Sequence, residues 1–93
     1  MISTKRLTLR DYVDKPVTSR VEARALEDAL ADCGLLLYSG PNVLLKRQLG
    51  STVEYVLAYT GVLVVARLDK ASGKLSYEVY YGREKLVEGE CRV

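Results

Sequence analysis

Apolar and polar residues alternate through most of the stretch from Val43 to Val93, and short groups of turn-forming residues interrupt the alternation. A period of two is typical of β-strands that bury one face, and tight turns between such segments are typical of an antiparallel meander. The expected turns contain glycine and lie at residues 50–51, 60–61, 70–73 and 82–84. The pattern therefore predicts an antiparallel sheet of four to five strands in this half of the chain.

The lengths of these turns predict which residues lie opposite one another in neighbouring strands. The first turn pairs Arg47 with Glu54, and the second pairs Glu54 with Arg67. The other pairs predicted from the four turns include Lys46 with Tyr55, Tyr55 with Ala66, Ala66 with Tyr77, Leu63 with Tyr80, Tyr81 with Lys85, and Val79 with Val87.

This register divides the strand residues between two unlike faces. One face is apolar and is expected to lie under a helix. It comprises Leu44, Val53, Tyr55, Leu57, Tyr59, Val62, Val64, Ala66, Leu68, Leu75, Tyr77, Val79, Tyr81, Val87 and Cys91, with Lys46, Gln48 and Lys85 toward its margin.

The other face is mixed. At one end Glu54 is expected between Arg47 and Arg67, which is the arrangement of a cross-strand ion ladder. Apolar residues cluster at the other end, namely Leu45, Val56, Leu63, Val65 and Tyr80. Because one helix cannot cover both faces, this cluster is expected to mark an interface or a ligand groove.

A helix is expected from Arg20 to Cys33. Ser19 and Glu22 have the spacing of a capping box, and Gly34 stands where a helix commonly ends. The apolar stripe of this helix comprises Val21, Ala25, Leu26, Ala29, Leu30 and Cys33, with Glu22 off it.

The chain is thus expected to form one α+β domain over residues 1–93, in which one main helix packs on a four- to five-stranded antiparallel β-meander. Its parts are a basic N-terminal arm (1–17), the helix (18–34) and the sheet (43–93). Residues 3–10 fit either an edge strand or a single turn capped by Thr8. Residues 35–38 fit either a short strand or a connection to the sheet.

Net charge is only +2, but the basic residues are unevenly distributed. Residues 1–24 carry six basic and three acidic residues, and residues 43–74 carry five basic and two acidic ones. All seven aromatic residues are tyrosines. The first three strands and the arm are therefore basic, and every aromatic ring bears a hydroxyl group that needs a partner or water.

Residues for catalysis are scarce. The chain has no histidine and no glycine-rich phosphate loop, so we expect no metal site, no cofactor and no enzymatic activity. Glu78 and Glu88 face each other in the predicted sheet, and solvated rim charges are the simpler interpretation. A small enzyme using Glu54, Glu78 or Glu88 would need these carboxylates to line a concave site.

Cys33 and Cys91 are interpreted as small buried apolar residues, with a disulfide between them as the alternative. We find no apolar segment typical of a signal peptide or a membrane span, so a cytoplasmic protein without membrane contact is expected. Few amides and many Glu, Arg, Val and Leu residues would suit a thermophile.

Basic residues and tyrosines together indicate single-stranded nucleic-acid binding, in which a positive groove holds phosphates and aromatic rings stack on bases. The expected phosphate contacts are Lys46, Arg47, Arg67 and Lys74, helped by Lys5, Arg6 and Arg10, and the expected stacking surfaces are Tyr55, Tyr77 and Tyr80. Alternating tyrosines are also typical of a core, so this alternative stays open.

One capped helix ahead of an antiparallel meander with a basic, tyrosine-bearing sheet resembles the archaeal ThermoDBP-related proteins, over residues 19–93. Those resemble the single-stranded DNA-binding protein of Thermoproteales. The resemblance implies binding of single-stranded DNA or RNA, without strong sequence preference, by a homodimer or tetramer. The alternative function is a protein-interaction module that self-associates through the mixed face and binds no nucleic acid.

Overall fold

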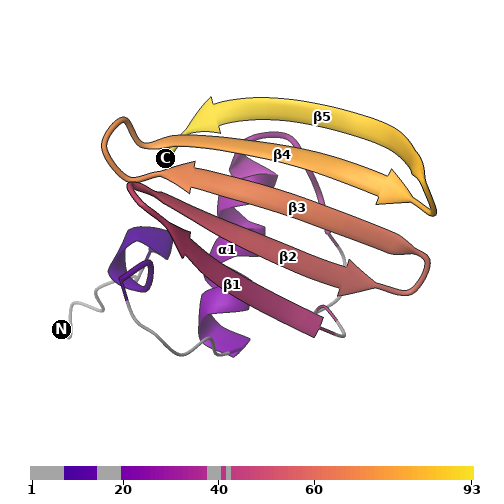
Figure 1. Cartoon of the computed structure of the whole chain (residues 1–93), viewed down its shortest axis with the longest axis horizontal. Coiled ribbons are helices and arrows are strands. Elements are labelled where there is room, and N and C mark those ends of the chain that lie inside the picture. The colour runs from indigo at the N-terminus through magenta and orange to yellow at the C-terminus, as the bar shows by residue number, and fades with distance from the viewer. Residues whose placement is uncertain (1–7, 15–19, 38–40, 42) are drawn as a thin grey trace, which may run out of the picture.

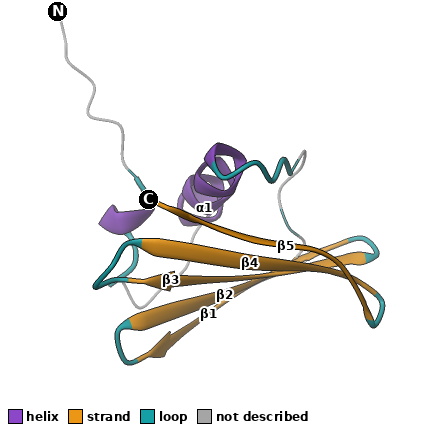
Figure 2. Cartoon of the chain, turned by 90° about the horizontal axis from the view of Figure 1, so that it is seen from above, coloured by secondary structure: helices purple, strands orange, loops and turns teal. Residues whose placement is uncertain are grey.

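One helix packs on one face of a five-stranded antiparallel sheet, as Figures 1 and 2 show, which confirms the predicted α+β fold. The computed structural model describes residues 8–14, 20–37, 41 and 43–93. The elements are a 3-10 turn η1 (Leu9–Asp11), the helix α1 (Arg20–Asp32), and strands β1 (Val43–Leu49), β2 (Thr52–Tyr59), β3 (Val62–Asp69), β4 (Lys74–Tyr81) and β5 (Glu84–Arg92). The strands lie in chain order, so that β1 and β5 form the two edges of the sheet.

The first three hairpins have the predicted register. Arg47 pairs with Glu54, and Glu54 pairs with Arg67. Leu63 pairs with Tyr80 across the third hairpin. Glycines with positive φ occupy these turns, for example Gly50 at 64° and Gly61 at 77°, a conformation that side chains with a Cβ rarely adopt.

The fourth hairpin differs from the prediction. Tyr81 pairs with Glu84, so the loop has two residues rather than three, and Lys85 pairs with Tyr80 rather than Tyr81. A bulge then restores the predicted pairing of Val79 with Val87. Because the bulge absorbs one residue, Lys85 moves from the predicted helix-side margin to the opposite face.

The helix ends as predicted. The amide of Gly34, whose φ is 101°, donates to the carbonyl of Ala31, and the amide of Leu35 donates to the carbonyl of Leu30. These two bonds form a Schellman motif. The predicted cap residue Ser19 lies outside the described residues.

The buried side of α1 is rotated relative to the prediction. Val21, expected in the apolar stripe, is 57% exposed, whereas Glu22, expected off the stripe, is fully buried with Leu26 and Leu30. The rotation follows from partners that the sheet offers to the Glu22 carboxylate, described below. The buried side of α1 therefore carries Glu22 together with Leu26 and Leu30, and Val21 lies outside it.

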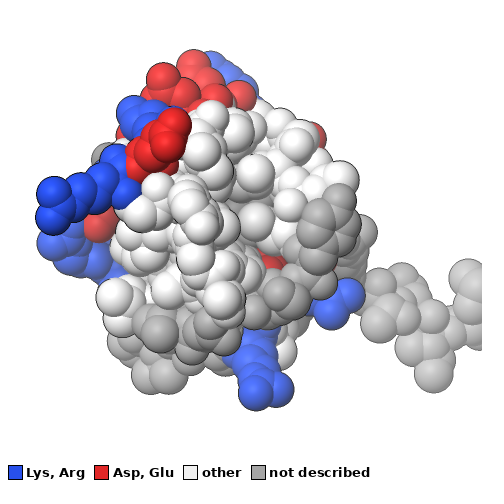
Figure 3. Space-filling view, turned by 90° about the vertical axis from the view of Figure 1, so that its right-hand side faces the viewer, with Lys and Arg blue, Asp and Glu red and all other residues white. Residues whose placement is uncertain are grey.

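The face of the sheet toward α1, here called the inner face, holds the core. Its buried members confirm the predicted apolar face at Val53, Tyr55, Leu57, Val64, Ala66, Leu68, Leu75, Tyr77 and Val79. Tyr81 and Val87 are the exceptions, because they are 61% and 47% exposed. At the end of the molecule viewed in Figure 3, acidic and basic side chains gather at the upper left, further basic ones lie along the lower edge, and the centre of the view is uncharged.

The N-terminal part of the described chain forms the single turn η1 rather than a strand over Leu9–Asp11. The backbone amide of Thr8 donates to Asp11 Oδ2 at 2.7 Å, and Leu9 and Val13 join the core. Residues 35–37 form a connection without strand pairing. The rest of the basic arm, with Lys5 and Arg6, lies outside the described residues.

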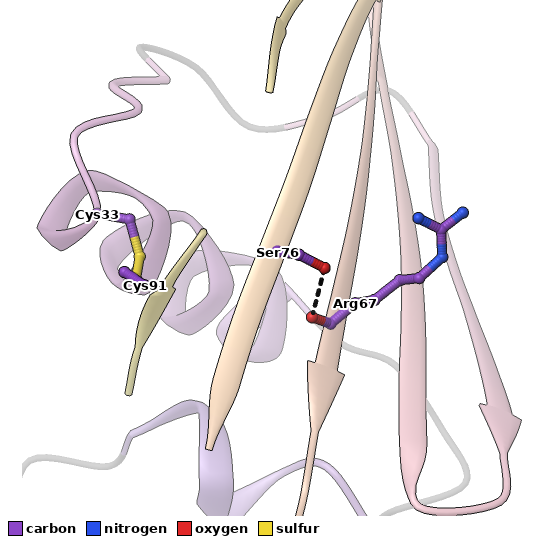
Figure 4. Close-up of a disulfide and its surroundings, with 4 residues drawn as sticks. All are labelled: Cys33, Arg67, Ser76 and Cys91. Atoms are coloured by element: carbon purple, nitrogen blue, oxygen red, sulfur yellow. Dashed lines mark hydrogen bonds between the residues drawn. A yellow bond between two sulfur atoms is a disulfide. The ribbon is translucent and has the colours of Figure 1, made fainter. Parts of the chain in front are cut away.

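Cys33 and Cys91 form a disulfide, so the interpretation as buried thiols is wrong and the alternative holds. In Figure 4 this bond lies on the helix side of the sheet, whereas the side chain of Arg67 points away from it. Within the described residues, no helix is long and apolar enough to span a membrane.

Candidate functional site

The face of the sheet opposite α1, here called the outer face, is bare. In Figure 2 both η1 and α1 lie on the same side of the sheet, and no described element covers the other side. Successive side chains of a strand point to opposite faces of the sheet, so about every second residue of each strand lies on this surface. It corresponds to the mixed face predicted from the sequence.

A continuous ion ladder crosses the outer face and uses every strand. Its bonds join Arg47 to Glu54 (2.8 Å), Glu54 to Arg67 (2.9 Å), Arg67 to Glu78 (3.1 Å), Glu78 to Lys85 (2.9 Å) and Lys85 to Glu88 (3.2 Å). The sequence predicted the first three members. The extension to Lys85 was missed because it depends on the two-residue loop and bulge of β5.

The ladder lowers the pKa of two of its carboxylates, Glu54 and Glu78. Hydrogen bonds from Lys85, Arg67 and Tyr80 lower the pKa of Glu78 to about 2. Partial burial by itself would raise the pKa of Glu54, but hydrogen bonds from Arg67 and Arg47 outweigh it and lower that pKa. Glu78 does pair with Glu88 across the strands, as predicted, but the surrounding cations override their mutual repulsion.

Five apolar residues occupy one corner of the outer face, here called the apolar corner. They are Leu45, Val56, Ala58, Leu63 and Val65, from β1, β2 and β3. Leu45 is 59% exposed and Leu63 is 39% exposed. On β4, Leu63 pairs with Tyr80 as predicted and Val65 pairs with Glu78, so the corner borders the Tyr80 ring and the ion ladder. A shallow groove of about 450 Å³ runs from this corner to the ladder, lined by Leu45, Lys46, Arg47, Glu54 and Val56.

Four of the seven predicted nucleic-acid-binding residues lie on the outer face, namely Arg47, Arg67, Lys74 and Tyr80. Each of them has an acidic partner. Arg47 and Arg67 belong to the ladder, the ammonium of Lys74 lies 2.8 Å from Glu90, and the hydroxyl of Tyr80 donates to Glu78 at 3.0 Å. The outer face therefore brings the cations together but neutralises them.

The other three predicted residues, Lys46, Tyr55 and Tyr77, lie in the interior. Tyr55 is fully buried, and Tyr77 packs its ring against Gly89, where a Cβ would come within 2.6 Å of the phenol oxygen. The side chain of Lys46 is only 4% exposed. None of the three presents a surface to a base or a phosphate, because each side chain is buried.

A buried polar cluster explains the positions of Tyr55 and Lys46. The Tyr55 hydroxyl donates to Glu22 Oε2 at 2.6 Å, and Lys46 Nζ lies 2.8 Å from the same oxygen. Lys46 also donates to the carbonyl of Tyr12 at 2.8 Å. Burial, together with the bond to Glu22, raises the pKa of Tyr55 well above its usual value. The cluster fixes α1 and η1 on the sheet, because each buried charge needs its partner.

Among the described residues, no group of three acidic or cysteine side chains is placed to hold a metal ion. Comparisons with protein-family models, with curated proteins and with solved structures found no match for this chain.

Proposed function

We propose that the chain is a non-catalytic interaction module that self-associates through its outer face, with the apolar corner at the centre of the contact. The observation that carries the proposal is the exposure of Leu45 and Leu63 beside Val56 and Val65, on a sheet face that no described element covers. Exposed apolar clusters on one side of a sheet are commonly buried by association.

The dimensions of the outer face suit a second copy of the chain. Five strands spaced about 4.8 Å apart, each about eight residues long, give a face of roughly 600 Å². This approaches the roughly 800 Å² that each partner buries in a standard interface. Two sheets can pack face to face at about 10 Å with interdigitating side chains.

The charges of the outer face also favour a protein partner. The ladder contains three cations and three carboxylates in alternation, from Arg47 at the β1 edge to Glu88 at the β5 edge. A second copy therefore meets no net charge over the ladder. A polyanion would instead have to displace carboxylates that already neutralise Arg47 and Arg67.

The test compares two exposed leucines that differ in location. Leu45→Glu places a charge in the apolar corner, whereas Leu36→Glu places one at a similarly exposed position in the connection after α1. By sedimentation equilibrium, the wild type and Leu36→Glu should associate and Leu45→Glu should be monomeric. A monomeric wild type at high micromolar concentration, or equal association of all three proteins, would overturn the proposal.

Single-stranded nucleic-acid binding is the second candidate. The observation in its favour is that the Arg47 and Arg67 side chains are 67% and 43% exposed and flank Glu54 beside the groove. Their guanidinium planes could reach phosphates or stack on bases. Labelled oligo-dT should then bind at low salt, weaken steeply at moderate salt, and lose affinity in Arg47→Glu/Arg67→Glu. No binding at low salt would exclude this candidate.

A further inference from the structure

The disulfide ties the edge strand β5 to the end of the helix. Cys33 directly follows α1, Cys91 lies near the end of β5, and 58 residues separate them in the sequence. Their Cα atoms lie 5.6 Å apart, and both residues are half-buried. A reducing thiol can therefore approach the bond without prior unfolding of the core.

Apart from this bond, β5 contributes little to the core. Among the described residues of β5, Cys91 is the only one whose apolar side chain packs against the core cluster. On the inner face, Val87 is exposed, and Gly89 offers only its backbone to the ring of Tyr77. The rest of the strand relies on its ladder of backbone bonds to β4, which a bulge interrupts.

The outer face of β5 is held by solvent-exposed ion pairs. Lys85 contacts Glu78, and Glu90 contacts Lys74. Exposed pairs of this kind contribute little to stability, because water solvates the separated charges nearly as well. Neither face of β5 therefore replaces the anchor that the disulfide supplies.

We propose that the Cys33–Cys91 disulfide is a redox latch that holds β5 on the sheet. In the reduction step, an external dithiol of the small-molecule or thioredoxin type attacks one sulfur through its thiolate. The Cys33–Cys91 bond breaks, both cysteines become thiols, and the external dithiol becomes a disulfide. β5 then opens from β4 locally, while β1 to β4 stay folded under α1.

The part of the fold that remains has its own anchors. Leu26 and Leu30 belong to one core cluster with buried residues of β2, β3 and β4, and the contacts of Glu22 with Tyr55 and Lys46 tie α1 to β1 and β2. The contacts of Glu22 do not involve β5. Opening would remove Lys85 and Glu88 from the ladder and leave the apolar corner intact. The latch therefore does not rest on the proposed self-association.

Hydrogen exchange of the full chain, read by mass spectrometry or NMR, tests the latch directly. The oxidised protein, the same protein in a phosphine reductant, and the variant Cys33→Ser/Cys91→Ser should be compared. Reduction should lower the protection of β5 amides by about tenfold or more, with β2 and β3 changed by less than about twofold. The double variant should resemble the reduced protein and should not respond to the reductant.

Two results would overturn the latch. Unchanged protection of β5 after reduction would show that backbone pairing alone holds the strand. Equal loss of protection in all five strands would show that the disulfide stabilises the whole domain rather than β5. Reoxidation should restore the protection of β5, and alkylation of the reduced thiols should prevent this recovery, which separates the redox step from any other effect of the reductant.

Discussion

Each face of the sheet carries a glutamate that contacts one tyrosine and one lysine, but the two clusters lie in different environments. On the inner face, Tyr55 and Lys46 both contact Glu22, at 2.6 and 2.8 Å. On the outer face, Tyr80 and Lys85 both contact Glu78, at 3.0 and 2.9 Å. The inner cluster is almost without solvent contact, whereas 22% of the Glu78 side chain and 42% of the Lys85 side chain are exposed.

The comparison shows that burial, rather than hydrogen-bond geometry, decides what such a cluster does. In the interior, water cannot replace a lost partner, so the cluster determines how α1 sits on the sheet. On the outer face, water competes for each group, and the cluster mainly sets local charge and side-chain orientation. The inner cluster therefore stabilises the position of α1, whereas the outer face is accessible to a partner.

Removing the lysine from each cluster should give the largest difference. Lys46→Met deprives the buried Glu22 carboxylate of its ammonium partner and should lower the free energy of unfolding by about 3 to 5 kcal/mol. Lys85→Met, the matched change on the outer face, should cost far less, because water solvates the exposed partner that is left behind. Urea denaturation of both variants measures the difference, and similar losses would contradict the comparison.

A double variant tests whether the unpaired charge of Glu22 causes the loss of stability in Lys46→Met. Lys46→Met/Glu22→Leu replaces the buried ion pair by apolar side chains of similar size. It should recover part of the stability lost in Lys46→Met, because no charge remains buried. If the double variant is as unstable as the sum of the single changes, Lys46 acts through packing rather than through the charge of Glu22.

Two alanine substitutions in β5 should also show that the inner face tolerates change less well than the outer face. A Cβ at Gly89 would lie 2.6 Å from the phenol oxygen of Tyr77 on the inner face, so Gly89→Ala should lower the free energy of unfolding by about 1 to 3 kcal/mol. The control is Glu88→Ala, at the neighbouring outer-face position, which should cost less than about 0.5 kcal/mol. Thermal denaturation followed by circular dichroism suffices to compare them.

Lowering the pH should weaken the contacts that Glu78 makes on the outer face. The pKa of Glu78 is about 2 in the folded protein against an ordinary value of 4.5. Its contribution to stability is therefore complete above about pH 4.5 and is lost as the pH falls toward 2. The difference in stability between wild type and Glu78→Gln should shrink over this interval. A constant difference across these pH values would rule out the ionised ladder.

The sequence predicted the architecture and three of four hairpin registers, because short loops of two or four residues that contain glycine leave few alternatives. The last register was missed at Lys85, since a three-residue loop and a two-residue loop with a bulge give the same pairing of Val79 with Val87. Only the local geometry of β5 distinguishes them. The pairing of Cys33 with Cys91 also stayed open, because it depends on where the helix ends above the sheet.

The candidate site was predicted in part. Alternation placed Arg47, Glu54 and Arg67 on one face correctly, but it could not tell whether Tyr55 and Tyr77 lie in a core or on a binding surface. That choice depends on which side of the sheet α1 covers. Glu22 was assigned to helix capping by its spacing from Ser19, and its burial arises from Tyr55 and Lys46, far away in the sequence.

Chemical shifts of backbone amides on dilution test the central claim, that the outer face is the contact between copies. Association through the outer face should produce concentration-dependent shifts at Leu45, Val56 and Leu63, with none at the exposed helix residue Val21. Shifts confined to α1, or spectra that do not change over the whole accessible concentration range, would contradict it.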